Sequence, residues 1–420
     1  MTRRRAAGGR HARIPNIGIV RRIYLPRCAD AVSFSMATYA IPLLVLATTG
    51  SAALTGIAFT LEWVPRLVAF SWAGAAVDRW GCTRVFRMAA TLRALVLLAA
   101  VAALTLVDDG LPATIAVMAL AAVTGVLTEY SYVAAETAGA LAGRKAGEGE
   151  HKIQSVLLGI DNTANLTGPA AGGLLLQYAG RTGMLLTIAG LSLLAAFLAP
   201  RDRLYRTAAV SASPMQGLRV GWATLRSLPA LAWLITGLTV SNIATGTLQA
   251  AAPVLIVQQM GHTSASVGLI WSAAAAASLL AVAICRFAID RAGLWPVGAV
   301  CAAIAAAAGF AVAQADAYTQ LLVLVAVLMA GEGGMTVVLR TLRSKLIPEA
   351  VFGSTLAVTI LIMLLPFPVA GLLVALTPTN LLGQVLTVCA ALQAIGLAAA
   401  FWQMRRDPAL ATRVAFTQAA

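Results

Sequence analysis

The chain has 420 residues, of which 60% are hydrophobic and only 11% are charged, against roughly a quarter charged in a soluble domain. This composition excludes a soluble protein. The formal net charge of +14 does not indicate nucleic-acid binding, because the basic residues form short clusters between apolar stretches rather than one basic face. The five cysteines and three histidines are scattered, so no disulfide framework, metal site or cofactor is predicted.

Twelve apolar stretches predict an all-α membrane protein, because each is long enough to cross about 30 Å of hydrocarbon. In chain order they cover residues 24–48, 52–77, 85–107, 112–135, 153–178, 182–199, 230–257, 264–289, 293–315, 318–339, 351–376 and 381–402. They form two six-helix bundles, over residues 23–200 and 229–403, with tails over 1–22 and 404–420.

The polar segment 201–228 links the two bundles. Residues 215–228 within it have apolar side chains at helical spacing, with Arg219 and Arg226 between them. This pattern predicts an amphipathic helix that lies along the membrane surface. A disordered tether is the alternative.

The basic residues predict the orientation of the chain in the bilayer. With the N-terminus inside, only Arg181 of the 30 basic residues faces outward, Arg66 and Arg93 lie within spans, and the remaining 27 lie at or near the cytoplasm. We therefore expect a multi-pass protein of the bacterial inner membrane with both termini in the cytoplasm.

A short pattern recurs in the two halves with an offset of 212 residues and no gap. Its first copy is Gly56, Asp78, Arg79 and Gly81, and its second is Gly268, Asp290, Arg291 and Gly293. Both copies must face the same side to satisfy the positive-inside rule, so the repeat contains an even number of crossings, six. The two halves are therefore parallel and pseudo-symmetric, with a cavity between them.

The loop between the second and third spans reads G-A-A-V-D-R-W-G-C-T-R over residues 74–84. It resembles the signature loop of the major facilitator superfamily, G-x-x-x-D-R-x-G-x-x-R. The second copy matches less fully, because Arg286 replaces the first glycine and Pro296 replaces the last arginine. The resemblance covers residues 21–406 and implies alternating access by rocking of the two halves.

A second motif, in the fifth span, is similar to the GPxxGG element of that superfamily's exporters. It consists of Gly168, Pro169, Gly172 and Gly173. Glycine and proline together remove bulk and a backbone donor, which predicts a bend and tight packing across the two halves. Ordinary small-residue packing is the alternative.

The first motif predicts a conformational latch at the cytoplasmic rim. Gly81 allows a tight turn and Gly74 allows close helix approach. Asp78, Arg79 and Arg84 are predicted to join the halves only while the cytoplasmic side is closed, and Asp290, Arg291 and Gly293 form the second copy. The alternative is that Asp-Arg merely ends a helix at the inner surface.

Acidic residues inside the spans are candidates for proton coupling, because an ionisable group in the bilayer is costly unless it has a function or a partner. They are Asp30, Glu62, Glu129, Asp161 and Glu332. We take Asp30 first, since it shares a face with Ser33 and its helix carries Tyr39. The alternatives are ion pairs: Asp30 with Arg27, Glu62 with Arg66 at i, i+4, and Glu129 or Asp161 with Arg93.

Polar and aromatic residues at mid-depth are candidates for a mostly apolar substrate cavity. They are Tyr39, Trp63, Tyr130, Asn162, Asn165, Asn242 and Gln249. The alternative for each is a hydrogen bond between helices.

The chain contains no G-x-x-x-x-G-K-[ST] loop, so a gradient is expected to drive it. We therefore expect a secondary active transporter that acts as a monomer and exports an amphipathic drug, antibiotic, siderophore or other metabolite in exchange for protons. An importer on the same fold is the main alternative. We do not expect an enzyme, because no catalytic groups cluster, and a channel would need a ring of repeated carbonyls or charges.

Overall fold

The computed structural model describes residues 20–106, 110–146, 150–200, 214–348 and 351–406. Most of the two predicted tails lies outside these residues, as do residues 201–213 of the predicted linker. The described part is almost entirely helical and contains no strand.

The N-terminal half is a bundle of six long helices that follow a short π-helical turn, η1 (Val20–Tyr24). They are α2 (Leu25–Thr49), α3 (Ala52–Trp80), α4 (Cys82–Leu106), α5 (Leu111–Ala146), α6 (Glu150–Tyr178) and α7 (Gly180–Leu198).

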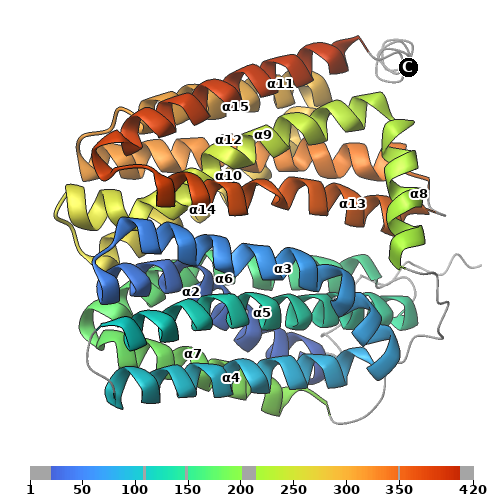
Figure 1. Cartoon of the computed structure of the whole chain (residues 1–420). Helices are drawn as coiled ribbons and strands as arrows, with labels where there is room; N and C mark the ends of the chain where they lie inside the picture. The colour runs from blue at the N-terminus through green and yellow to red at the C-terminus, as the bar shows by residue number, and fades with distance from the viewer. Residues whose placement is uncertain (1–19, 107–109, 147–149, 201–213, 349–350, 407–420) are drawn as a thin grey trace, which may run out of the picture.

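The C-terminal half has the same plan. Its elements are α9 (Pro229–Pro253) with η3 (Val254–Gln259), α10 (Ser264–Ala292), α11 (Leu294–Val312), α12 (Tyr318–Leu346), α13 (Phe352–Leu364), α14 (Pro366–Leu376), η5 (Thr379–Leu381) and α15 (Leu382–Arg405). The two halves lie one above the other with their helices running in roughly the same direction (Figure 1).

The twelve predicted crossings are all present as helices. In the described part, 11 segments are long and apolar enough to cross a membrane. The remaining crossing is α6, which has 29 residues but is more polar, because it carries Asp161, Asn162 and Asn165.

Three crossings differ from their predicted extent by more than three residues or by a break in the helix. The stretch predicted as one helix over 351–376 is two, because Pro366 begins a new helix, α14, after α13 ends at Leu364; proline has no N–H to continue the α-helical ladder. Helix α5 runs eleven residues past the predicted limit of 135, and α12 seven past 339. Hydropathy marks where a helix leaves the bilayer and not where it ends.

The repeated Asp-Arg-x-Gly pattern ends α3 and α10 with the same backbone turn. Gly81 has φ 85° and Gly293 has φ 88°, in the region that favours glycine. The tight turn expected at Gly81 is therefore present, and its counterpart in the other half has the same form. We call the end of the bundle that carries these turns the DRxG end, and the opposite one the far end.

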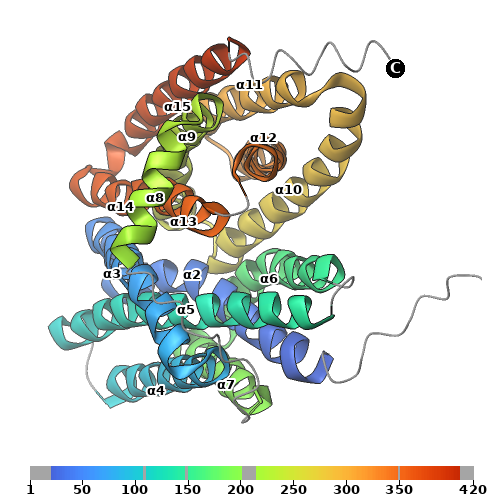
Figure 2. The same ribbon diagram turned by 90° about the vertical axis from the view of Figure 1, so that its right-hand side faces the viewer.

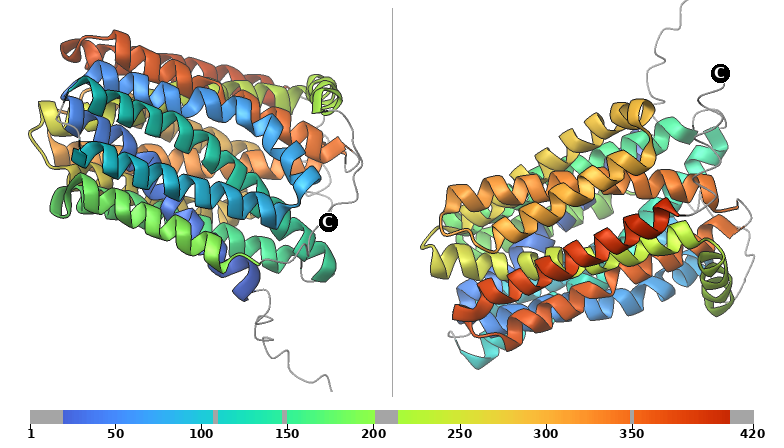
Figure 3. Two further views of the ribbon diagram at one scale, coloured as in Figure 1. Left: turned by 60° about the horizontal axis from the view of Figure 1, so that its bottom comes forward. Right: turned by 90° about the horizontal axis from the view of Figure 1, so that it is seen from above.

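Helix α8 (Pro214–Arg226) lies within the predicted linker and stands across the DRxG end (Figures 1 and 2). Other views show it at the same end (Figure 3). Leu225 is buried, and a Cβ at Gly221 would strike the carbonyl of Ser354, so α8 packs closely on α13. Trp222 is half-exposed, and the Arg226 guanidinium lies 5.0 Å from the centre of its ring. One face of this amphipathic helix thus packs on the protein, and the opposite face is exposed.

Candidate functional site

The two halves touch closely at the far end, where the repeated glycines Gly56 and Gly268 lie. A Cβ at Gly56, in α3, would sit 2.5 Å from the backbone of Gly371 and of Ala375 in α14. A Cβ at Gly268, in α10, would strike the carbonyl of Pro169 in α6. The two glycines therefore make equivalent contacts: Gly56 of the N-terminal half packs on the C-terminal half, and Gly268 of the C-terminal half packs on the N-terminal half.

Polar and aromatic contacts accompany the glycines. The Thr60 hydroxyl donates to the Pro368 carbonyl at 3.1 Å, and the Ser272 hydroxyl accepts from the backbone N–H of Ala170 at 3.1 Å. Trp63 stacks on Phe367 with ring centres 4.3 Å apart. These contacts all join the N-terminal to the C-terminal half, so the far end is closed.

A cavity of about 590 Å³ lies between the halves, nearer the DRxG end. Its lining comes from α2, α3, α5 and α6 on one side and from α12 and α13 on the other. A second cavity of about 260 Å³ shares Leu158, Asn162, Asn165 and Arg340 with the first. Tyr39 and Trp271 line the second cavity from opposite halves, with ring centres 5.4 Å apart.

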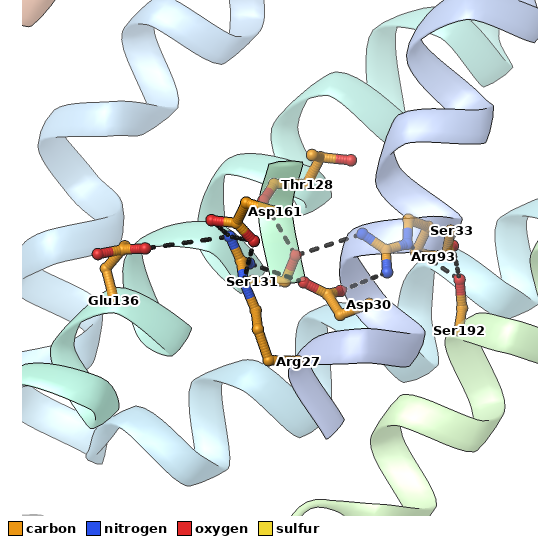
Figure 4. Close-up of polar contacts among 9 residues, drawn as sticks. All are labelled: Arg27, Asp30, Ser33, Arg93, Thr128, Ser131, Glu136, Asp161 and Ser192. Carbon is orange, nitrogen blue, oxygen red and sulfur yellow. Dashed lines mark hydrogen bonds and ion pairs between the residues drawn. The ribbon is translucent and has the colours of Figure 1, made fainter. Parts of the chain in front are cut away.

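Arg93 is the most deeply buried charge of the N-terminal half, with no exposed surface. Its guanidinium donates to Asp30 Oδ1 at 2.5 Å, to Ser131 Oγ at 3.2 Å and to Ser192 Oγ at 3.0 Å (Figure 4). These partners lie on α2, α5 and α7, so one side chain of α4 ties four helices together. Ser33 completes the network by a 2.7 Å hydrogen bond to Ser192.

Arg27 contacts three carboxylates and connects this buried network to the cavity. It donates two 2.9 Å hydrogen bonds to Asp161, one to each carboxylate oxygen, and one of 3.3 Å to Asp30. Glu136 lies 4.0 Å away. Asp161 and Glu136 line the cavity with Arg27, whereas Asp30 does not. The expected pair of Asp30 with Arg27 is present, but Asp30 bonds more closely to Arg93.

None of the three ion pairs weighed for Glu62, Glu129 and Asp161 is present among the described residues. Arg66 does not pair with Glu62 one turn away; its Nε donates to Glu129 Oε2 on α5 at 2.8 Å. Glu129 therefore pairs with Arg66 rather than Arg93, and Asp161 with Arg27. Glu62 is buried, and its Oε2 has no hydrogen-bond partner among the described residues. Spacing along one helix could not reveal partners on neighbouring helices.

Glu332 lies in the C-terminal half, outside both cavities. Its carboxylate accepts a hydrogen bond from the Ser241 hydroxyl and one of 3.1 Å from Gln393 Nε2. Gln393 also donates to Ser241 at 2.8 Å. Glu332 thus joins α12 to α9 and α15 through neutral partners. The part of any of these acids in proton coupling stays a prediction.

The predicted cavity residues divide into two groups. Asn162 and Asn165 line both cavities, and Tyr39 lines the second. The others line neither; they are Trp63, Tyr130, Asn242 and Gln249. The Asn242 side chain joins two helices, since its Nδ2 donates to the Met363 carbonyl at 2.7 Å.

The described side chains of the motif at the DRxG end make no hydrogen bond or ion pair to the other half in this conformation. A Cβ at Gly74 would meet nothing within 4 Å, so the close approach expected there is absent. Arg79 and Arg84 are exposed, as are Asp290 and Arg291. The side chain of Asp78 lies outside the described part of the structure. The latch is predicted for the state in which this end is closed, and it stays a prediction.

The GPxxGG element packs on both sides of α6. A Cβ at Gly168 would lie 2.5 Å from Ser35 Oγ, and one at Gly172 3.2 Å from Ala40, both on α2. A Cβ at Gly173 would lie 2.5 Å from the Ser264 carbonyl on α10, in the other half. The small residues therefore allow α6 to approach a helix of each half.

Three polar residues of the first cavity were not identified as candidates from the sequence: Glu136, Tyr132 and Arg340. Glu136 fell one residue beyond the predicted limit of its span, and Arg340 was counted only as a mark of the cytoplasmic side. Tyr132 stands over Arg27, 5.1 Å from the guanidinium to the ring centre. Among the described residues, no group of three or more His, Cys, Asp or Glu could hold a metal ion.

Comparison with known families agrees with this architecture of paired bundles around a cavity. The model of the Major Facilitator Superfamily matches residues 27–371. The chain belongs to the major facilitator superfamily. Membership of this family makes the chain a membrane transporter and not an intramembrane enzyme.

One curated protein is related in sequence to this superfamily transporter over part of its length. The multidrug efflux pump Tap of Mycolicibacterium fortuitum is 35% identical over 212 residues, which cover 47% of this chain and 51% of the pump. The match thus spans about half the length of that relative.

Solved structures share the fold at low identity. A bacterial homologue of the iron transporter ferroportin in an inward-facing state has a TM-score of 0.73 at 15% identity, covering 90% of this chain and 97% of that one. The nucleoside transporter NupG has a TM-score of 0.68 at 13% identity, covering 90% and 99%. A ferroportin homologue in an outward-facing state has a TM-score of 0.60 at 16% identity, covering 91% and 98%.

Proposed function

We propose that this transporter is a proton-coupled exporter of an amphipathic small organic molecule, working by alternating access in a bacterial inner membrane. The observation that carries the proposal is the cavity between the halves. Its size suits a drug-sized ligand, and aromatic and aliphatic walls at Phe34, Phe70 and Leu364 stand beside the amides of Asn162 and Asn165. The partial match to a multidrug efflux pump supports export.

The DRxG end is proposed to face the cytoplasm, so that this conformation is inward-facing. The excess of basic residues at this end supports that orientation. The closed far end supports it as well, since the close contacts at Gly56 and Gly268 join the halves at the end opposite to the DRxG turns. The TM-score is also higher for the inward-facing ferroportin homologue than for the outward-facing one.

We propose Asp161 as the carboxylate that exchanges a proton. It faces the cavity with 22% of its side chain exposed, whereas Asp30 is 1% exposed and held by Arg93. Breaking a buried ion pair is costly when it leaves a charge alone. Arg27 is not left alone when Asp161 takes a proton, because Asp30 and Glu136 are already within 3.3 and 4.0 Å of it. This arrangement lowers the cost of each protonation cycle.

Replacing Asp161 by asparagine is therefore expected to uncouple transport from the proton gradient. Gradient-driven uptake of substrate into inverted vesicles should fall to the level measured without a gradient. Exchange of labelled for unlabelled substrate should continue, because it needs no net proton movement. Both can be measured in the same vesicles.

Glu332→Gln is the matched control, since it makes the same change of acid to amide outside the cavity. It should keep gradient-driven uptake. Loss of coupling in Glu332→Gln together with normal coupling in Asp161→Asn would contradict the assignment of the proton to Asp161.

The proposed direction is tested in a host stripped of its own efflux pumps. Expression of the chain should raise tolerance to some members of a panel of amphipathic compounds and lower their accumulation in cells. A protonophore should abolish both effects. Higher accumulation in expressing cells would indicate import and would overturn the proposal.

A further inference from the structure

The charges that line the cavity pair almost completely within the N-terminal half. Arg66 pairs with Glu129 at 2.8 Å, and Arg27 with Asp161 at 2.9 Å. Asp30, behind them, pairs with Arg93 at 2.5 Å. Three arginines thus form ion pairs with three acids, and each pair is also hydrogen-bonded.

Glu136 is the acid left over on this wall. It makes no hydrogen bond among the described residues, and its contact is the 4.0 Å approach to Arg27, which is already engaged by two closer carboxylates. Its side chain is 40% exposed, the most of any acid in the network. In Figure 4 it lies at the outer edge of the network, away from Arg93. The N-terminal wall therefore presents one carboxylate in excess.

Arg340 is the single charged residue that the C-terminal half contributes to the described lining of either cavity. It lies on α12, is exposed, and has no ion pair among the described residues. Arg343, three residues on, is buried and donates to Met363 Sδ at 3.5 Å instead. The C-terminal wall therefore presents one guanidinium in excess.

The two unmatched charges face a shared space from opposite walls. Glu136 and Arg340 line the same cavity; they attract each other electrostatically but lie beyond the 4.0 Å limit of an ion pair. Apolar side chains, including Phe34, Phe70 and Ile360, line the same cavity. A ligand with one charge would leave the other wall charge unpaired once water is displaced, which is unfavourable. A ligand with both charges would satisfy both walls.

We infer that the substrate is a zwitterionic amphipathic molecule, whose cationic group is bound by Glu136 and whose anionic group is bound by Arg340. A guanidinium can hold a carboxylate or phosphate through two parallel N–H donors, which gives Arg340 directional selectivity. This inference rests on the proposed transport of an amphipathic molecule through this cavity, and it narrows the chemical class of that molecule.

The test uses the purified full-length protein and four ligands built on one fluorescent naphthalene scaffold. One carries an ammonium group, one a carboxylate, one both groups and one neither. Equilibrium binding is measured by fluorescence. The wild-type protein is expected to bind the zwitterion at least about tenfold more tightly than either singly charged ligand, a difference of about 1.4 kcal/mol.

Two variants separate the roles of the walls. Glu136→Gln should bind the zwitterion no better than the carboxylate ligand, and should bind the carboxylate ligand more tightly than the wild type does, because no wall charge is then left unpaired. Arg340→Gln should lose the preference over the ammonium ligand and should bind the ammonium ligand more tightly than the wild type does, for the same reason. Arg286→Gln, on the exposed part of α10 and outside the described lining, is the control and should match the wild type.

Other outcomes would overturn the inference. If Arg340→Gln weakened all four ligands equally, Glu136 and Arg340 would act on each other when the cavity closes and not on the substrate. Equal binding of all four ligands by the wild type, or binding of none, would also overturn it. Export of amphipathic compounds in the stripped host would then still stand, and its absence there would remove the proposed function itself.

Discussion

Arg93→Met is expected to destabilise the protein by about 3–5 kcal/mol, the cost of removing one member of a buried ion pair. The guanidinium has no exposed surface and holds Asp30, Ser131 and Ser192 at once. Methionine fills much of the volume of the arginine side chain. The buried carboxylate of Asp30 loses its closer cationic partner and keeps only the 3.3 Å contact with Arg27. A large fall in the temperature of thermal unfolding in detergent, with lower yield of monodisperse protein, is the result to look for.

A second substitution distinguishes loss of charge pairing from loss of packing. In the double variant Arg93→Met with Asp30→Asn the orphaned charge is gone, so part of the stability should return. Arg286→Met removes an exposed arginine and should change the unfolding temperature little. If the single and double variants were equally unstable, the ion pair would not be the cause.

Valine at Gly56 or Gly268 is expected to shift the transporter away from the conformation in which the far end is closed. A Cβ at Gly56 would already lie 2.5 Å from the backbone of α14, and one at Gly268 would strike the backbone of α6, so neither neighbour can move as a flexible side chain does. Overpacking of this kind costs about 1–3 kcal/mol, which changes the ratio of two conformations by about 5- to 150-fold.

Distances between spin labels on the two halves, measured at both ends of the bundle, would report this shift. The far end should open and the DRxG end should close. Gly190→Val is the control, because a Cβ there meets nothing within 4 Å. An unchanged distance distribution in Gly56→Val and Gly268→Val would show that these contacts do not set the balance between the states.

The repeat was the most informative feature of the sequence. Its offset placed Gly56 and Gly268 in equivalent positions, and the structure places both at contacts between the halves. Their steric role could not be predicted, because the partner helices α14 and α6 are far away in the chain. Likewise Pro366 was visible in the sequence, but hydropathy alone did not show that it divides a crossing in two.

The site was predicted in part. Asn162, Asn165 and Asp161 were selected because they are polar residues inside a span, and they line the cavity. The pairing of the acids was not predictable, since Arg66 lies one turn from Glu62 yet bonds to a carboxylate 63 residues away. Glu136 was missed because α5 continues beyond its apolar part. Depth in a span can be read from one helix, whereas pairing depends on how helices are rotated against each other.

The polarity of α6 also bears on how the protein is assembled during synthesis. An aspartate at the centre of a helix adds about 2.5–3.5 kcal/mol to the cost of leaving the translocon for lipid, and α6 carries Asp161 beside Asn162 and Asn165. Arg27, which holds Asp161 by two hydrogen bonds, is on α2 and has been made more than a hundred residues earlier. Because α2 is synthesised before α6, the cationic partner of Asp161 is made first. Helix α6 can therefore enter the bilayer next to α2 and form the ion pair as it inserts.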